Sequence, residues 1–180
     1  MGSISFGYLF SKYVSKIDIR KIGSGNIGAT NVLRSGNKKI GYLTLTLDVL
    51  KAVTPVLYVK YYIPELIYIS SLSVFLGHVF PIWLKFKGGK GVATYVGILF
   101  SISYILGIIF ITTWLLIFFI TRYSSLGSLL STMVIPIFVF FNTNYENEYF
   151  FTILFVLIFF THRENVKRLI NKEESKTKIY

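Results

Sequence analysis

The stretch K-F-K-G-G-K-G-V-A-T, from Lys85 to Thr94, combines three lysines with three glycines between two long apolar runs. Glycines let backbone N–H groups come close to an anion, and Gly88–Gly91 opens directly into an apolar segment. These donors would therefore stand at a helix start, where the macrodipole favours negative charge. Gly91 follows Lys90 where a nucleotide-binding loop carries a hydroxyl for magnesium. The stretch predicts a phosphate site without a metal–nucleotide complex; the alternative, a positively charged membrane anchor, would not need the glycines.

A second glycine-rich stretch, G-S-G-N-I-G-A-T-N-V-L-R, runs from Gly23 to Arg34. Its Ser, Asn and Thr side chains add hydrogen-bond donors, and its arginine suits bidentate contact with phosphate. The glycine spacing is not that of a dinucleotide-binding fingerprint, and no strand precedes it. A solvated turn is the alternative, although two asparagines, a threonine and an arginine within nine residues favour binding. From both stretches we predict these substrate-binding residues: Ser24, Gly25, Asn26, Thr30, Asn31, Lys85, Gly88, Gly89 and Gly91.

The stretch H-R-E-N-V-K-R follows the last apolar run. At helical spacing, His162 and Asn165 share one face while Arg163 and Lys167 share another, so a helix continuing out of the membrane would turn the first pair towards a site. A charged stop after a transmembrane helix is the alternative, and it explains the basic pair better than His162 and Asn165. The nearest acid, Glu164, points away from the imidazole, which leaves the sequence without a local partner for it.

Other polar residues lie at informative places. Asp48 and Lys51 stand three apart within an apolar run, where an ion pair bridging helices is the preferred interpretation, because unpaired ionisable groups in a span are costly. For His78, in G-H-V-F-P, a hydrogen bond inside the bundle is at least as good an explanation as catalysis. Asp18 is a distant candidate to orient His162.

The chain has no cysteine, no H-E-x-x-H and no carboxylate cluster, so we predict neither a metal nor a cofactor.

Composition places these motifs on an integral membrane protein. The 180 residues are 53% hydrophobic with a mean hydropathy of +0.62, and 15% are charged, against about a quarter in soluble domains. The net charge is +11. The lysines and arginines lie between apolar runs and not along one stripe, which argues against nucleic acid as a partner. The N-terminus lacks the basic region and cleavage site of a secretory signal peptide.

Most lysines and arginines gather in residues 16–39, 85–90, 122 and the tail after 162, which the positive-inside rule places in the cytoplasm. The apolar runs 40–84 and 126–161 must then cross twice each, with breaks at Tyr61–Glu65 and Asn142–Glu148. A crossing takes about 20 residues. The run 92–121 is therefore predicted as two short tilted helices broken near Ser103, with a re-entrant pair as the alternative.

These spans predict an all-α integral membrane bundle of about seven transmembrane helices, in one domain covering residues 1–180. The N-terminus is expected outside and the C-terminus in the cytoplasm. The apolar part of the first helix, Gly2–Ser11, covers roughly 15 Å, which is half a bilayer. This helix is therefore expected to be truncated or partial.

Together, the segments G-S-I-S-F-G-Y, G-S-G-N-I-G-A-T-N-V-L-R, G-H-V-F-P…K-F-K-G-G-K-G-V-A-T and H-R-E-N-V-K-R resemble the bacterial membrane-integral glycerol-3-phosphate acyltransferases that use acyl phosphate, the PlsY family. The resemblance runs from Gly2 to about Leu169. Ser5 stands where the family usually has proline, and Ala52 where it usually has glycine. Neither histidine begins the H-x4-D base of the thioester-dependent acyltransferases.

The resemblance implies a multi-pass protein of the bacterial cytoplasmic (inner) membrane that moves a fatty acyl group from acyl phosphate to the 1-hydroxyl of sn-glycerol 3-phosphate. The products are 1-acylglycerol 3-phosphate (lysophosphatidate) and phosphate, in the first step of phospholipid synthesis. Besides the two substrates, membrane lipid and the soluble enzyme that makes acyl phosphate are implied partners. The family's substrate-contacting positions correspond to Ser24 and to four expected catalytic residues, Arg34, Lys90, His162 and Asn165.

Acyl phosphate is already activated, so direct attack by the glycerol hydroxyl is favoured, with Arg34 and Lys90 holding the anionic reactants together. His162 and the substrate's own phosphate are both candidate proton acceptors. A small anion or phosphate-ester transporter is the competing class. A transporter should carry charges at the membrane midplane and be built from repeated halves. Of these features, the chain shows only the charges of Asp48 and Lys51.

Overall fold

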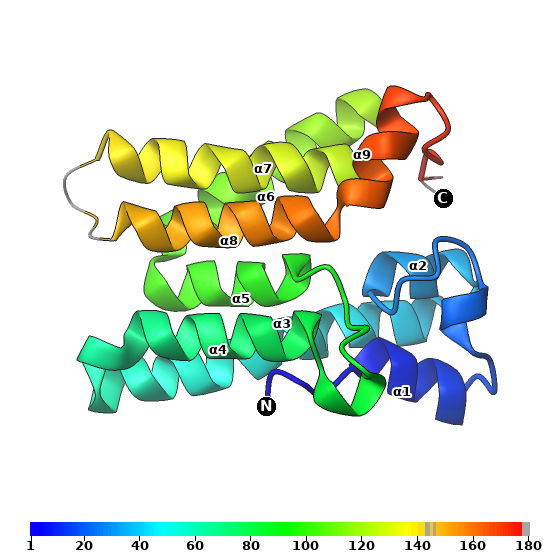
Figure 1. Ribbon diagram of the computed structural model, residues 1–180, viewed down its shortest axis with the longest axis horizontal. Coiled ribbons are helices and arrows are strands. Elements are labelled where there is room, and N and C mark those ends of the chain that lie inside the picture. The colour runs from blue at the N-terminus through cyan, green and yellow to red at the C-terminus, as the bar shows by residue number, and fades with distance from the viewer. Residues whose placement is uncertain (143–144, 146, 178–180) are drawn as a thin grey trace. The chain divides into compact units, whose positions relative to one another are not determined.

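The computed structural model describes residues 1–142, 145 and 147–177 of the chain (Figure 1). These residues form α-helices and short 3-10 helices with no strand among them, which confirms the all-α prediction. They divide into two compact units, Met1–Ile102 and Ser103–Tyr180. The first unit carries both glycine-rich stretches, and the second carries H-R-E-N-V-K-R.

The first unit is built around the long helix α3, which packs against α1, α2, α4 and α5. Gly97 lets α5 approach α3 closely, because a Cβ there would lie 2.5 Å from the carbonyl oxygen of Val49. The side chain of Asn37 caps the start of α3 by accepting the N–H of Ile40 at 3.1 Å. The elements of this unit are α1 (Phe6–Tyr13), η1 (Ile19–Lys21), α2 (Ala29–Arg34), α3 (Lys38–Tyr62), η2 (Pro64–Leu66), α4 (Ile67–Val79), η3 (Ile82–Leu84) and α5 (Val92–Ile102).

Two predicted helix breaks are confirmed. The break at Tyr61–Glu65 lies where α3 ends at Tyr62 and η2 begins at Pro64. Proline has no backbone N–H to continue the helical hydrogen bonds, so the chain turns there. The second break separates α5 from α6 at Ser103, whose backbone is extended (φ −151°, ψ 126°).

In the second unit, α7 packs against both α6 and α8, and α9 packs against α8. Hydroxyl groups inside α7 are satisfied locally: Ser131 and Thr132 donate to carbonyls one turn earlier, at 2.7 and 2.6 Å. The predicted break at Asn142–Glu148 separates α7 from α8, although residues 143, 144 and 146 lie outside the described residues, as does Lys178 of the basic tail. The elements of this unit are α6 (Tyr104–Thr121), α7 (Ser124–Phe140), α8 (Glu148–Thr161) and α9 (Arg163–Ile170).

The prediction of one helix continuing from the last apolar run is wrong. α8 ends at Thr161 and α9 leaves it at an angle of 62°. The bend lies at His162, whose backbone (φ −96°, ψ 5°) is outside the helical region. The predicted two faces are nevertheless present, because His162 and Asn165 are buried while Arg163 and Lys167 are exposed.

Several described helices are suited to a lipid bilayer. Lys38–Tyr62, Pro64–Leu84 and Tyr104–Thr121 are long and apolar enough to cross it, and the bent pair α8–α9 is a fourth candidate, while α5 and α7 are apolar but shorter. Helix α6 exposes large apolar side chains such as Phe119 and Ile120, as lipid contact requires. Helix α1 has eight residues, about 12 Å, so it is too short to cross by itself.

Candidate functional site

The stretch Gly23–Arg34 is organised around the buried side chain of Asn31. Its Oδ1 accepts the N–H of Ser24 at 3.0 Å, and its Nδ2 donates to the carbonyl oxygens of Asn26 at 2.8 Å and Ile22 at 2.9 Å. Both ends of the amide are therefore used by the backbone of the loop. Asn31 thus holds the loop, and substrate contact by its side chain stays a prediction.

Glycines make this arrangement possible. Gly23 (φ 56°) and Gly25 (φ 70°) have left-handed backbones, which side-chain-bearing residues rarely adopt. A Cβ at Gly23 would also overlap the Oδ1 of Asn31. The side chains of Ser24, Thr30 and Arg34 are exposed, so these are the groups that the stretch presents outwards.

The second stretch folds back onto the end of α4. The N–H of Gly88 donates to the carbonyl of Val79 at 3.1 Å, and the N–H of Gly89 donates to the carbonyl of His78 at 3.2 Å. A Cβ at Gly88 would overlap both carbonyl oxygens. Glycine is thus required here for close packing, and these two N–H groups bond the end of α4. That Gly88 and Gly89 bind substrate stays a prediction.

The end of the second stretch forms the start of α5. Lys90 is half-buried and leads through Gly91 (φ 87°) into α5. The first N–H groups of an α-helix have no acceptor within the helix, so the start of α5 still offers backbone donors next to Lys90. Lys85, at the other end of the loop, is exposed.

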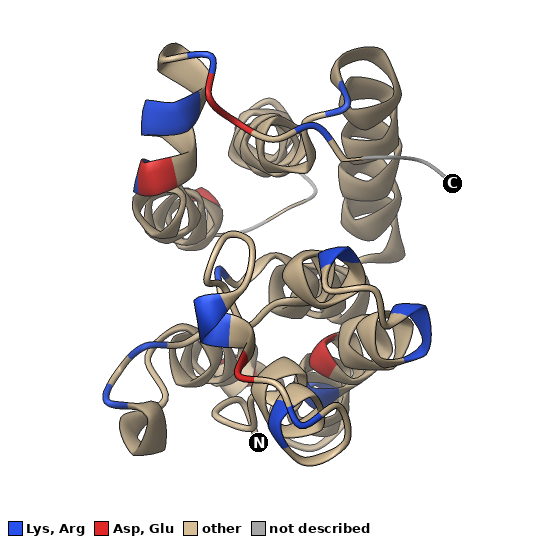
Figure 2. Ribbon diagram, turned by 90° about the vertical axis from the view of Figure 1, so that its right-hand side faces the viewer, with Lys and Arg blue, Asp and Glu red and all other residues tan. Residues whose placement is uncertain are grey.

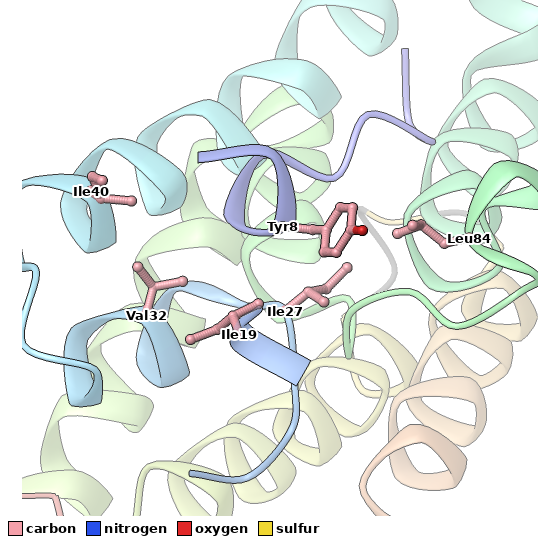
Figure 3. Packing of buried hydrophobic residues seen from close by; sticks show 6 residues of the cluster. All are labelled: Tyr8, Ile19, Ile27, Val32, Ile40 and Leu84. Atoms are coloured by element: carbon pink, nitrogen blue, oxygen red, sulfur yellow. The ribbon is translucent and has the colours of Figure 1, made fainter. Parts of the chain in front are cut away.

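The first stretch and the residue just before the second contribute to one small core (Figure 3). Ile27 and Val32 come from the first stretch, and Leu84 directly precedes the second. The ring of Tyr8 lies close to both Ile27 and Leu84 in Figure 3. The full core comprises Tyr8, Ile19, Ile27, Val32, Ile40 and Leu84. The structure therefore places the first stretch and the residue before the second against one core in the first unit. Figure 2 marks the Lys and Arg residues of the chain in blue.

In the second unit, His162 and Asn165 are both buried, and Asn165 belongs to a hydrogen-bonded cluster around Glu174. The Oε1 of Glu174 accepts from Asn165 Nδ2 at 2.9 Å and from Ser125 Oγ at 3.1 Å, and its Oε2 accepts from Arg168 Nε at 2.8 Å. Burial alone would raise the pKa of Glu174, but these donors outweigh it and the pKa lies below its usual value. Glu174 is therefore a carboxylate that joins the start of α7 to α9.

Sequence reasoning missed Glu174 and Ser125. Glu173 and Glu174 are adjacent in a polar tail, and only the fold shows that the second is buried while the first is exposed. Ser125 is one of two neighbouring serines at the start of α7, and no residue pattern sets it apart.

The imidazole of His162 also has a partner that the sequence could not show. Its Nδ1 lies 2.8 Å from the carbonyl oxygen of Ile158. A carbonyl only accepts, so Nδ1 carries the proton and, in the neutral ring, Nε2 carries the lone pair. This corrects the expectation that no local group orients the ring. Asp18, the distant candidate, is held by Arg20 at 2.8 Å, and that hydrogen bond lowers the pKa of Asp18 to about 2.

The predicted catalytic residues are thus divided between the units, with Arg34 and Lys90 in the first and His162 and Asn165 in the second. Across the described parts of both, no three His, Asp or Glu side chains come together as metal ligands would.

With this geometry in hand, the comparison with known proteins is decisive. The family model of glycerol-3-phosphate acyltransferases matches residues 1–172. The chain belongs to this family. The glycerol-3-phosphate acyltransferase of Pelagibacter ubique (strain HTCC1062) is 65% identical over 180 residues, covering 100% of this chain and 94% of the relative. The acyltransferase of Mesorhizobium japonicum is 45% identical over 176 residues, covering 98% and 90%.

Solved structures give the same result. The crystal structure of PlsY (YgiH), an integral membrane glycerol 3-phosphate acyltransferase, in its glycerol 3-phosphate form, is similar with a TM-score of 0.92 at 37% identity, over 98% of this chain and 90% of that chain. Its lysophosphatidic acid form gives 0.89 at 36% identity with the same coverage. The resemblance to PlsY is confirmed, and this acyltransferase-family chain is an integral membrane protein with the PlsY fold.

Proposed function

We propose that this protein transfers a fatty acyl group from acyl phosphate to the 1-hydroxyl of sn-glycerol 3-phosphate, giving 1-acylglycerol 3-phosphate and phosphate. Membership of the family supports glycerol 3-phosphate as the acceptor. The related PlsY has been solved in glycerol 3-phosphate and lysophosphatidic acid forms, which correspond to an acceptor and its acylated product. In the cell this reaction is the first step of bacterial phospholipid synthesis.

One structural observation carries the proposal: the first glycine-rich stretch, through Ile27 and Val32, and the residue that precedes the second, Leu84, belong to the same core. Both proposed substrates bear a phosphate, so two cationic stretches in one unit fit two anionic reactants. Arg34 is exposed at the end of α2, and Lys90 is half-buried beside the start of α5. An arginine offers a bidentate contact and a lysine a point charge.

The chemistry needs no covalent intermediate, because acyl phosphate is a mixed anhydride. The glycerol oxygen attacks the carbonyl carbon and an ester bond forms. The bond between that carbon and the phosphate oxygen breaks, and phosphate leaves with the bonding electrons. Arg34 and Lys90 hold the reactants in contact and offset the negative charge on phosphate.

The hydroxyl proton has two candidate acceptors. One is the Nε2 of His162, which carries the lone pair when Nδ1 donates to Ile158. The other is the phosphate of the substrate itself. Asn165, anchored by Glu174, would position a substrate hydroxyl or carbonyl. Ser24, Thr30 and the backbone at Gly91 would add substrate contacts.

We also propose the membrane arrangement. Seven crossings, with both glycine-rich stretches and the C-terminal tail in the cytoplasm, follow from the charge pattern of one acyltransferase domain in the inner membrane. The soluble enzyme that makes acyl phosphate would deliver the second substrate to that side.

The test is phosphate release from palmitoyl phosphate by the purified protein in detergent, with and without glycerol 3-phosphate. The proposal expects release that depends on glycerol 3-phosphate and saturates with it. A transporter, the competing class, would instead carry a labelled phosphate ester into liposomes without consuming palmitoyl phosphate. That outcome would contradict the proposal.

A further inference from the structure

A buried polar cluster in the first unit has no part in the proposed reaction. It consists of Asp48 and Lys51 on α3 and His78 on α4, which are 3%, 6% and 3% exposed. Lys51 Nζ lies 2.7 Å from Asp48 Oδ1, 2.8 Å from His78 Nδ1 and 2.6 Å from the carbonyl oxygen of Ile4. The predicted ion pair is confirmed, and it joins the N-terminal segment to α3 and α4.

The cluster determines how the imidazole of His78 is held. An ammonium group has three protons and only donates, and Lys51 has three acceptors around it. His78 Nδ1 must therefore accept, which puts the proton of the neutral ring on Nε2. Turning the ring over would take the acceptor away from a buried ammonium group, and leaving such a group unsatisfied is costly. The ring is thus fixed in one orientation.

The far edge of this ring meets the glycine loop. A Cβ at Gly89 would overlap His78 Nε2 and lie 2.7 Å from its Cε1. The N–H of Gly89 also donates to the backbone carbonyl of His78, at 3.2 Å. Gly89 therefore packs against both the main chain and the ring of His78, and the next residue is Lys90.

We propose that His78, held in place by Lys51 and Asp48, is a positioning residue for the phosphate-binding loop. The edge of the imidazole ring fixes the position of Gly89 relative to α4. It thereby fixes where Lys90 and the start of α5 meet the phosphate group of a substrate. The identity of that anion rests on the proposed function, whereas the contact between His78 and Gly89 does not. His78 itself touches no substrate in this account.

The contact can be tested by a double-mutant cycle that combines Gly89→Ala with His78→Asn. Asparagine keeps an acceptor where Nδ1 stands, so Lys51 stays satisfied, but it lacks the Nε2 and Cε1 atoms that the new methyl would strike. In the wild-type background Gly89→Ala should displace the loop and lower kcat/KM by about a hundredfold, which is the usual effect of a misplacement near 1 Å. In the His78→Asn background, Gly89→Ala should lower kcat/KM by less than about threefold.

Gly88→Ala is the matched control, because a Cβ at Gly88 would strike the backbone carbonyl oxygens of His78 and Val79 and not the ring. Gly88→Ala should lower kcat/KM by the same factor in the wild-type and His78→Asn backgrounds. Should Gly89→Ala not accumulate as folded protein, the yield of monodisperse protein in detergent serves as the readout, and His78→Asn should restore it. An equal cost of Gly89→Ala in the two backgrounds, or no restored yield, contradicts the proposal.

A second readout separates positioning from a merely structural role. If the loop is displaced, the KM for at least one of the two phosphate-bearing substrates should rise about tenfold or more in Gly89→Ala, while the melting temperature of the purified protein changes little. His78→Ala, which removes one of the three acceptors around Lys51, should lower the melting temperature more than His78→Asn does. A fall in kcat with both KM values unchanged refutes positioning. An inactive wild-type protein would refute the proposed function instead, and the melting temperatures would still report on the contact.

Discussion

Replacing Glu174 by alanine tests whether the buried carboxylate in the second unit holds Asn165 ready for the reaction. The change removes three hydrogen bonds at once, from Asn165, Ser125 and Arg168. It also leaves two buried donors, on Asn165 and Ser125, without the acceptor that they share.

The expected loss of stability in Glu174→Ala follows from these contacts. A neutral hydrogen bond contributes about 1 kcal/mol net and one to a charged group about 1.5–3 kcal/mol. Arg168 is partly exposed, so its bond to Glu174 is discounted for solvent screening. Since coupled contacts are not additive, we expect a loss of about 2–4 kcal/mol in the free energy of unfolding. Once Asn165 can turn away from the site, kcat/KM should fall by at least about tenfold.

The assay uses purified protein in detergent, measuring the melting temperature and glycerol 3-phosphate-dependent phosphate release for three variants. Glu174→Gln keeps an oxygen that can accept from Asn165 and Ser125, so it should keep activity within about fivefold. Glu173→Ala is the control, because Glu173 is exposed and one position away. It should behave as the wild type. Equal activity of Glu174→Ala and Glu173→Ala would refute the link between Glu174 and Asn165.

Four further predictions concern charge, metal, protons and pH. Arg34→Ala and Lys90→Ala should each lower activity about a hundredfold without loss of membrane insertion, since each removes a charged phosphate contact; near-normal turnover at saturating substrate would remove that residue from the site. Activity should persist in chelator, and complete loss that magnesium restores would count against a metal-free reaction. If His162 is the base, His162→Ala should cost about 10²–10⁴ in rate and the acid limb of the pH profile should vanish; if the substrate phosphate takes the proton, His162→Gln should keep most activity and the limb. Because the pKa of Glu174 is lowered on folding, its stabilisation is complete above the usual value of 4.5 and is lost as pH falls through the folded pKa; Glu174→Gln should therefore flatten the fall of the melting temperature below pH 4.5.

The sequence was sufficient for the all-α class and for several helix ends, because those depend on local chemistry. Pro64 cannot continue a helix, and the polar Ser103 interrupts an apolar run, so both breaks could be predicted. The ion pair of Asp48 and Lys51 was predictable for the same reason, since buried charges three residues apart need each other.

What escaped prediction depends on contacts between distant parts of the chain or on backbone groups. Asn31 looks like a ligand in sequence, but its amide is used by carbonyls of its own loop. Gly88 looks like an anion-binding residue, but its N–H is taken by the end of α4. The partner of His162 is a main-chain carbonyl, which every residue has and no pattern marks.

The measurement closest to the central claim is the product formed from palmitoyl phosphate and glycerol 3-phosphate by the purified protein. Mass spectrometry of the lipid extract, together with a phosphate assay, gives both products in one reaction. The account predicts 1-palmitoylglycerol 3-phosphate and phosphate in equal amounts, both absent when glycerol 3-phosphate is left out and both strongly reduced in Lys90→Ala. Phosphate without the acylated product, or acylation only from a thioester donor, would contradict it.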